Sequence, residues 1–112
     1  MLPAKNRLKL KKDFERVFKE GKGYKENCLY LKLVKNNLES SRFGFAVGKK
    51  YSNKATLRNK IKRRLREIIR PALPDIKKGA DAVIVVLPGA EMDNFQELDF
   101  ALKKLFKKAK LI

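Results

Sequence analysis

The stretch "DAVIVVLPG", residues 81–89, decides the fold expected for this chain. Its β-branched residues follow one another without a polar interruption, which is typical of a strand buried on both faces. A chain of 112 residues can bury one modest core but not two. We therefore expect a single domain, residues 1–112, built on one central sheet that contains this strand.

A helix is expected on each side of this strand in the sequence. Before it, residues 54–70 form a strongly basic helix that we expect Pro71 and Pro74 to stop. After it, "DNFQELDFALKKLFKKAK" begins with an Asp or Asn cap. Its apolar residues recur at helical spacing, namely Leu98, Ala101, Leu102, Leu105 and Ala109.

The first half of the chain is expected to contain one helix and two strands. "LKKDFERVFKEG" places apolar residues on one helical face, at Leu10, Phe14, Val17 and Phe18. The runs at 28–35 and 42–49, separated by "NNLESS", are typical of a hairpin. The predicted order is αββαβα, an α+β or α/β sandwich with one sheet.

The composition favours a folded protein with a polyanionic partner. Lys and Arg number 29 against 12 Asp and Glu, a net charge of +17. That charge repels itself unless a polyanion such as a nucleic acid is bound. The 44% apolar fraction, with seven Phe and three Tyr, argues against a disordered basic tail. No apolar run reaches the roughly 20 residues that span a bilayer, and no secretory signal is evident, so we expect a cytoplasmic protein.

The charge is concentrated between Lys49 and Arg70, which include ten basic residues and one acid, Glu67. A helical wheel separates this helix into two faces. The apolar stripe contains Leu57, Ile61, Leu65, Ile68 and Ala72, and the opposite face carries Asn59, Arg63, Arg66 and Arg70, with Lys62 close by. Solvated helix faces usually mix both signs at i,i+4, and here Glu67 alone is available. The pattern predicts a nucleic-acid surface, although charge alone does not distinguish RNA from DNA.

Two segments closely resemble the bacterial ribonuclease P protein family. They are "LKKDFERVFKEGK", residues 10–22, and "RFGFAVGKKYSNKATLRNKIKRRLREIIR", residues 42–70. The family's signature is an Arg-Asn-Arg helix after a Gly-x-x-Val-x-Lys-Lys strand end. Arg58 and Asn59 match it, and Lys60 replaces the third residue, which keeps the charge but weakens bidentate contacts. The likeness extends from about residue 5 to about residue 108.

The resemblance implies a fold and an activity. The fold would contain a rare left-handed βαβ crossover, as in the second domain of a small-subunit ribosomal protein, where the default expectation is a right-handed one. The protein would bind a catalytic RNA as a monomer in a 1:1 ribonucleoprotein that removes the 5′ leader of precursor tRNA. Mg²⁺, bound mainly by the RNA, would support the hydrolysis.

The resemblance also implies two groups of site residues. The basic helix and the loop before it would contact RNA through Lys49, Lys50, Lys54, Arg58, Asn59, Lys60, Lys62, Arg63 and Arg66. A cleft between the first helix and the sheet would hold the leader, with Phe14 and Phe18 as stacking rings and with Tyr30 and Lys32 on the first strand. Aromatic residues one turn apart are also ordinary core residues, and that alternative stays open.

The residues themselves indicate no protein catalyst. There is no histidine, and no nucleophile lies beside a base. Asp93, Glu97 and Asp99 come nearest to a metal cluster, and we interpret them as acids favoured at a helix start. We therefore predict neither catalytic nor metal-binding side chains. The alternatives are a ribosomal or structured-RNA-binding protein and a major-groove DNA reader, which would require a helix-turn-helix.

Overall fold

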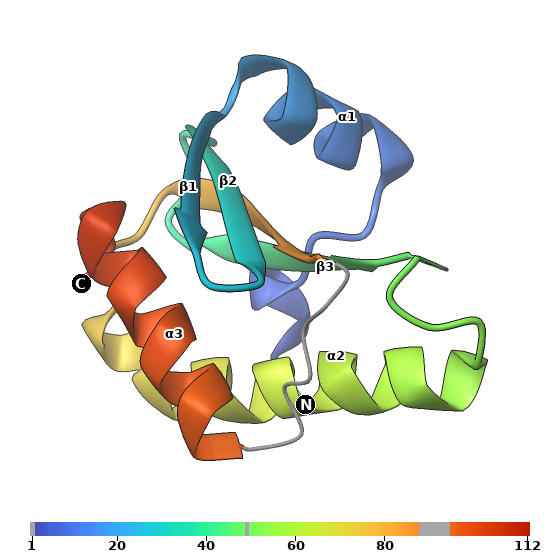
Figure 1. Cartoon of the computed structure of the whole chain (residues 1–112). Helices are drawn as coiled ribbons and strands as arrows, with labels where there is room; N and C mark the ends of the chain where they lie inside the picture. Colours follow the sequence, from blue (N-terminus) through green and yellow to red (C-terminus); the bar gives the residue numbers. More distant parts are fainter. Residues whose placement is uncertain (1, 49, 88–94) are drawn as a thin grey trace.

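The computed structural model describes residues 2–48, 50–87 and 95–112, and these residues form one four-stranded sheet with helices on both faces (Figure 1). The elements in chain order are η1 (Ala4–Asn6), α1 (Lys11–Glu20), β1 (Lys22–Glu26), β2 (Leu29–Lys35), β3 (Arg42–Val47), α2 (Ala55–Ala72), η2 (Leu73–Asp75), β4 (Ala80–Val86) and α3 (Phe95–Lys108). No helix in this part of the chain is long and apolar enough to cross a membrane. The α+β class with one central sheet is confirmed.

The sheet has the order β1-β2-β4-β3, so the predicted hairpin of the runs at 28–35 and 42–49 is wrong. β4 lies between them, antiparallel to β2 and parallel to β3. Its apolar residues are buried on both faces, which favours the central place. Asn36 stabilises the loop between these two strands: its side chain donates to the Ser40 carbonyl oxygen (3.1 Å) and accepts from the Leu38 N–H (2.7 Å).

β1 is a strand that the expected order lacks. Its sequence, "KGYKE", has little apolar periodicity, and it forms because it pairs with β2. The turn between them contains Asn27 at φ 56°, a left-handed conformation that Asn tolerates. β1 therefore makes the hairpin with β2 that was expected of β3.

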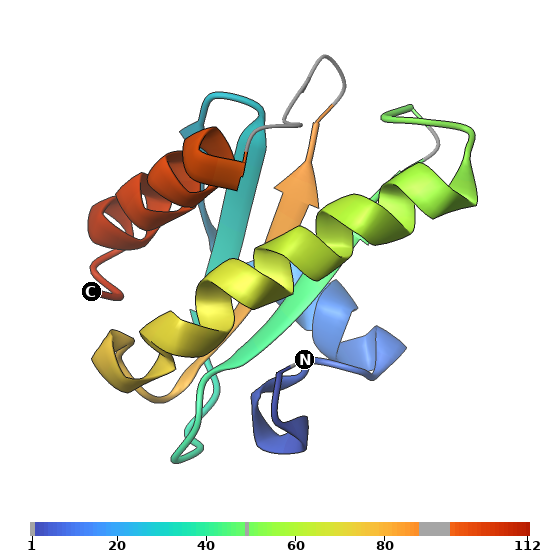
Figure 2. The ribbon, with the colours of Figure 1, turned by 90° about the horizontal axis from the view of Figure 1, so that it is seen from below.

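α1 covers one face of the sheet, and α2 and α3 cover the other (Figure 1). α2 connects the parallel neighbours β3 and β4. With α2 in front and both strands pointing upward, β4 lies to the left of β3, which is a left-handed crossover (Figure 2). The helix that carries the basic face thus lies between two strands and does not belong to a helix-turn-helix.

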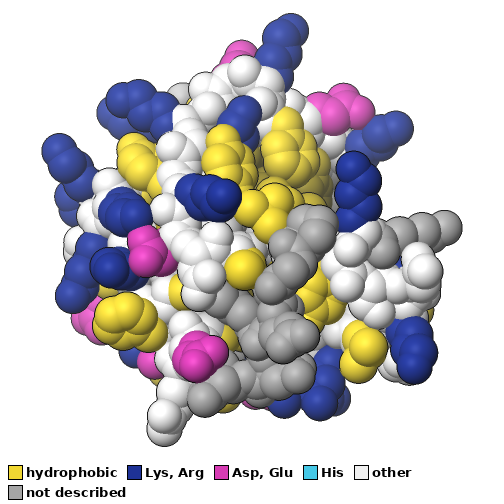
Figure 3. Space-filling model, in the orientation of Figure 1, with side chains coloured by type: hydrophobic (Ala, Val, Ile, Leu, Met, Phe, Trp, Pro, Cys, Tyr) yellow, Lys and Arg dark blue, Asp and Glu magenta, His cyan; other side chains and the backbone are white. Residues whose placement is uncertain are grey.

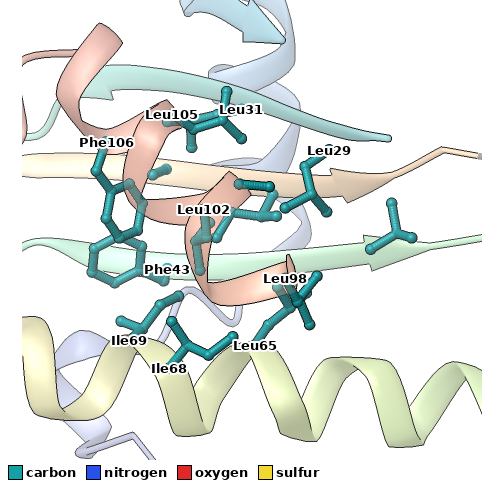
Figure 4. Close-up of a cluster of buried hydrophobic side chains, with 14 of the residues drawn as sticks. Leu29, Leu31, Phe43, Leu65, Ile68, Ile69, Leu98, Leu102, Leu105 and Phe106 are labelled. Atoms are coloured by element: carbon teal, nitrogen blue, oxygen red, sulfur yellow. The ribbon is translucent and has the colours of Figure 1, made fainter. Parts of the chain in front are cut away.

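The larger core lies between the sheet and α2 with α3 (Figure 4). Alternate strand residues point into it, among them Leu29 and Leu31 of β2 and Phe43 of β3. The rings of Phe43 and Phe106 lie 5.9 Å apart between their centroids. Of the apolar face predicted for the last helix, Leu98, Ala101, Leu102 and Leu105 are buried and Ala109 is half-buried. The predicted helix cap lies outside the described residues.

The apolar stripe of α2 is mostly as predicted. Ile61, Leu65 and Ile68 are buried and Ala72 is half-buried, whereas Leu57 is 45% exposed and Ile69 is an additional buried residue. The helix continues through Pro71 to Ala72 and does not stop before it. In the last turn Pro71 removes only one backbone hydrogen bond, and Leu73–Asp75 follow as a 3₁₀ turn.

Candidate nucleic-acid interface

The buried stripe of α2 sets which side chains face outward. Because Ile61 and Leu65 are anchored in the core, Asn59, Lys60 and Arg63 are exposed on the opposite side. A surface hollow runs along this side, and the described residues that line it are Thr56, Asn59, Lys60, Arg63, Arg66 and Glu67. The amide of Asn59, which can both donate and accept hydrogen bonds, lies here among cations. The cations suit phosphate groups, and the amide suits one more specific contact to a base edge or a 2′-hydroxyl.

Arg58 has a different position from its neighbours in the motif. It is half-buried, and its Nη1 donates to the Ser52 carbonyl oxygen at 2.8 Å. Ser52 in turn accepts from the Lys54 N–H through Oγ (3.1 Å). Arg58 therefore holds the loop before α2, where Lys50 and Lys54 are exposed. Lys49, predicted to extend this surface, lies outside the described residues.

Lys62 and Arg66 turn toward the sheet. Both are half-buried, and the Arg66 guanidinium lies over the Phe45 ring of β3, 5.4 Å from its centroid. A guanidinium over an aromatic face is a favourable cation–π arrangement. The cations of α2 thus form an outer group, along the hollow of Asn59, and a group beside the edge strand β3.

The opposite face of the sheet carries the predicted cleft. Three rows of paired residues cross it: Tyr30–Val85–Ala46, Lys32–Val83–Gly44 and Val34–Asp81–Arg42. Val83 and Asp81 are buried, whereas Tyr30, Val85 and Ala46 are only half-buried. α1, with ten residues, leaves the first row partly open to solvent. Figure 3 shows hydrophobic side chains exposed between α1 and the sheet, with Lys and Arg around them.

The two phenylalanines of α1 have different surroundings. Phe14 is half-buried and packs against the small core of Leu8, Val17 and Val83. A Cβ at Gly44 would lie 2.5 Å from Phe14 Cζ, so the ring occupies the space that glycine leaves. Phe18 is 41% exposed. Phe14 is partly a core residue, and Phe18 presents its ring to solvent.

Tyr30 and Lys32 lie at the β1 side of this cleft. The Tyr30 ring occupies the space over Gly23 of β1, where a Cβ would overlap its hydroxyl. Lys32 Nζ donates to the Phe18 carbonyl oxygen (2.5 Å) and so ties β2 to the end of α1. The structure thus brings all four predicted cleft residues to the α1 side of the sheet.

A buried ion-pair network fixes α1 against the sheet, and the sequence showed no signal for it. Asp81 is fully buried and accepts from Arg42 Nε (2.8 Å), Arg42 Nη2 (2.6 Å) and Asn36 Nδ2 (2.8 Å). From α1, Arg16 Nη1 lies 3.9 Å from Asp81 Oδ2, and Asp13 Oδ2 lies 3.6 Å from Arg42 Nη1. Arg16 Nη2 also donates to the Lys35 carbonyl oxygen (2.6 Å).

The network determines the charge state of Asp81. Burial alone would raise the pKa of this carboxyl, but hydrogen bonds from Arg42 and Asn36 and the charges of Arg42 and Arg16 outweigh it and lower the pKa below 3.8. The hydrogen bond to Asp81 in turn raises the pKa of Arg42. Asp81 is therefore a buried anion that helps to hold α1 against the sheet.

Glu26, at the α3 side of the sheet, is also paired. Glu26 of β1 lies 3.5 Å from Lys104 Nζ and 2.5 Å from Lys108 Nζ, and the hydrogen bond from Lys108 is the main cause of its lowered pKa. Within residues 2–48, 50–87 and 95–112, no group of three His, Cys, Asp or Glu could hold a metal ion.

The two predicted surfaces meet at the edge of β3. A hollow there is lined by Phe14 of α1, by Gly44 and Phe45 of β3 and by Lys62 and Arg66 of α2. The chain before α1 adds Arg7 and Lys9. Arg7 and Lys9 were not among the site residues predicted from the sequence, because they lack a periodic pattern that would place them.

Comparisons with known proteins point to one family. Residues 2–110 match the model of the family described as Ribonuclease P. A ribonuclease P protein component from a Pseudanabaena species is 40% identical over 113 residues, covering 100% of this chain and 97% of the relative. One from Thermotoga petrophila is 41% identical, covering 86% of this chain and 80% of the relative.

Solved structures give the same result. The RNase P protein from Thermotoga maritima superposes with a TM-score of 0.83 at 37% identity, covering 91% of this chain and 96% of that one. The Staphylococcus aureus RNase P protein has a TM-score of 0.86 at 28% identity, covering 95% and 96% of the two chains.

Proposed function

The chain belongs to the ribonuclease P protein family, the protein component of a hydrolase that acts in tRNA processing, and we propose on that premise that it binds both the catalytic RNA and the 5′ leader of precursor tRNA. The RNA partner of the ribonucleoprotein follows from the family. Our proposal concerns which surfaces the two RNAs use. The alternative of a ribosomal or general structured-RNA-binding protein has no support from relatives that match the whole chain as ribonuclease P components.

In this proposal the outer face of α2 binds the catalytic RNA. Lys60 and Arg63 contact phosphates, and Asn59 makes the directional contact to a base edge or 2′-hydroxyl. Arg58 acts partly through the Ser52 loop, which it holds beside the helix start together with Lys50 and Lys54. The buried stripe supports this assignment, because it prevents α2 from turning these residues inward.

The cleft beside α1 binds the single-stranded leader. Phe18 supplies an exposed ring, Tyr30 and Phe14 supply half-buried ones, and Lys32 supplies a charge. Stacking on rings tolerates any base, as a leader that differs between substrates requires.

The chemistry belongs to the RNA in this proposal. Mg²⁺ held mainly by the catalytic RNA would supply the activated water and stabilise the leaving oxygen. The protein's residues bind the substrate, hold its leader and offset phosphate repulsion at the site of assembly. We further propose a 1:1 complex in the cytoplasm with a monomeric protein.

The observation that carries the proposal is the hollow at the β3 edge, which joins the aromatic cleft to the cations of α2. The test is to add the purified protein to a bacterial catalytic RNA at low Mg²⁺ and to measure cleavage of precursor tRNA at the mature 5′ end. We expect stimulation, and its absence would refute the proposal.

A matched pair of variants separates a specific surface from bulk charge. Lys60→Gln with Arg63→Gln removes two charges from the outer face of α2, and Lys103→Gln with Lys107→Gln removes two exposed charges from α3. We expect only the α2 pair to lower the affinity for the catalytic RNA strongly. Equal losses would show that net charge alone is responsible.

A further inference from the structure

Arg7 is placed like a ligand-binding residue, and its side chain has no hydrogen-bond or ion-pair partner among residues 2–48, 50–87 and 95–112. It follows η1 and forms an isolated bridge with Phe43 beside β3, where the Leu8 N–H donates to the Phe43 carbonyl oxygen (2.9 Å). Figure 2 shows this N-terminal segment passing next to β3 and α2. Its Nε is buried and has no hydrogen-bond partner. Buried donors are nearly always paired, so this one requires an explanation.

The nearby carboxylates do not provide one. Asp13 and Glu39 lie around a neighbouring hollow that Arg7 also borders. Asp13 pairs with Arg42, and among the described residues no ion pair or side-chain hydrogen bond joins either acid to Arg7. Arg16 and Arg42 each have a carboxylate partner, whereas Arg7 has none in this part of the chain.

On its other side Arg7 lines the hollow at the β3 edge, which has a volume of about 300 Å³. Lys9, Lys62 and Arg66 line it as well, so cations from two separate parts of the chain converge there. No described acid lines this hollow. Phe14 and Phe45 form apolar walls beside the charges. Convergent cations without a carboxylate are stabilised by a bound anion, and a guanidinium suits phosphate in particular.

We propose that Arg7, with Lys62 and Arg66, binds a backbone phosphate of the 5′ leader where the strand leaves the cleft beside α1 and passes the edge of β3. This inference rests on the proposed function and adds a site to it. The leader is favoured over the catalytic RNA because Phe14 borders both the cleft and this hollow. A single strand that stacks beside Phe14 thereby places its next phosphate among the three cations.

The experiment uses the complete ribonucleoprotein assembled with wild-type protein, Arg7→Gln, Arg7→Lys or Lys5→Gln. The last variant loses the same charge two residues away and outside the hollow. Affinities for precursor tRNA and for mature tRNA are measured across a range of salt concentrations.

We expect Arg7→Gln to weaken precursor binding on the order of tenfold and to leave mature tRNA binding unchanged, as loss of one charged hydrogen-bond donor predicts. The slope of log affinity against log salt should become shallower by about 0.7, the value for one phosphate contact on a single strand. Arg7→Lys should recover part of the affinity. Lys5→Gln should stay close to wild type.

Equal losses for precursor and mature tRNA, no loss, or the same loss in Lys5→Gln would overturn the proposal. Arg7→Gln removes no side-chain hydrogen bond or ion pair between described residues, so its thermal midpoint should stay close to that of wild type. If the thermal midpoint of Arg7→Gln is lower than that of wild type, the site is tested in the wild-type protein instead. The NMR resonance of the Arg7 Nε–H must then shift when a single-stranded leader oligonucleotide is added, and an unchanged resonance would overturn the site. Wild-type protein that fails to stimulate the catalytic RNA would instead contradict the proposed function itself.

Discussion

Arg42 and Asp81 face each other on the parallel strands β3 and β4 and are joined by two hydrogen bonds, Nε to Oδ1 at 2.8 Å and Nη2 to Oδ2 at 2.6 Å. Asp13 and Arg16 of α1 extend this pair. The helix that forms one wall of the cleft is therefore held by a charge cluster and not only by apolar packing.

Asp81→Asn should destabilise the protein strongly. The substitution removes the charged carboxylate that accepts both hydrogen bonds from the partly buried Arg42 guanidinium and leaves Asp13, 3.6 Å away, as its remaining described counter-charge. Breaking a buried pair in this way costs about 3–5 kcal/mol. Denaturant unfolding would measure the loss. Glu39→Gln, which changes an exposed carboxylate, should stay within about 0.5 kcal/mol of wild type. A loss of similar size in both would contradict the role of the network.

The same network predicts a dependence of stability on pH. The pKa of Asp81 is lower in the folded state than its ordinary value of 3.8. Its contribution is therefore complete above about pH 4 and is lost as the pH falls through the lower folded-state pKa. The free-energy gap between wild type and Asp81→Asn should shrink at acidic pH. A constant gap from neutral pH to the acid limit would argue against this linkage.

Gly44→Ala should disturb the cleft, and Gly48→Ala should not. The new Cβ at Gly44 would lie 2.5 Å from Phe14 Cζ and would displace the ring, at a cost of about 1–3 kcal/mol. At Gly48 the nearest atom lies 4.0 Å away. We expect a lower thermal midpoint and weaker precursor binding for Gly44→Ala alone. Matching behaviour of the two variants would disprove the close packing of Phe14.

Phe18→Ala and Phe14→Ala should have separable effects. The Phe18 ring is 41% exposed, so its removal should change stability by less than about 1 kcal/mol. It should weaken precursor binding by roughly 1–3 kcal/mol through lost stacking and leave mature tRNA binding unchanged. Phe14→Ala should additionally lower stability by about 2 kcal/mol. If Phe18→Ala affects precursor and mature tRNA equally, this ring does not contact the leader.

Asn59→Ala and Arg58→Ala should also differ. Asn59 is exposed and has no described hydrogen bond, so its loss should weaken assembly with the catalytic RNA at unchanged stability. Arg58→Ala also frees the Ser52 carbonyl oxygen and should loosen the loop before α2. Amide hydrogen exchange at Lys54 reports this directly. Faster exchange in Arg58→Ala but not in Asn59→Ala is the expected result.

The predictions from sequence succeeded where the signal is local. The apolar residues Ile61, Leu65 and Ile68 recur at helical spacing, and they are buried as that spacing requires. The run that begins at Asp81 correctly indicated a strand buried on both faces, which is β4 (Ala80–Val86), while residues 88 and 89 of the run lie outside the described residues. The predicted hairpin of the runs at 28–35 and 42–49 was wrong because the sequence pattern of two apolar runs joined by a short loop is the same whether the strands pair directly or a third strand lies between them. β1 was missed because its exposed residues carry no periodic signal.

The amino-acid sequence by itself determined that α2 has an anchored face and a cationic face, because helix geometry places those residues whatever surrounds them. It also determined, through its resemblance to a family, the activity in which the chain takes part. Only the tertiary structure decided that β4 separates β2 from β3, that Asp81 meets Arg42 and Arg16, and that Arg7 reaches the cations of α2. These contacts join residues far apart in the chain, and such contacts leave no trace in local spacing.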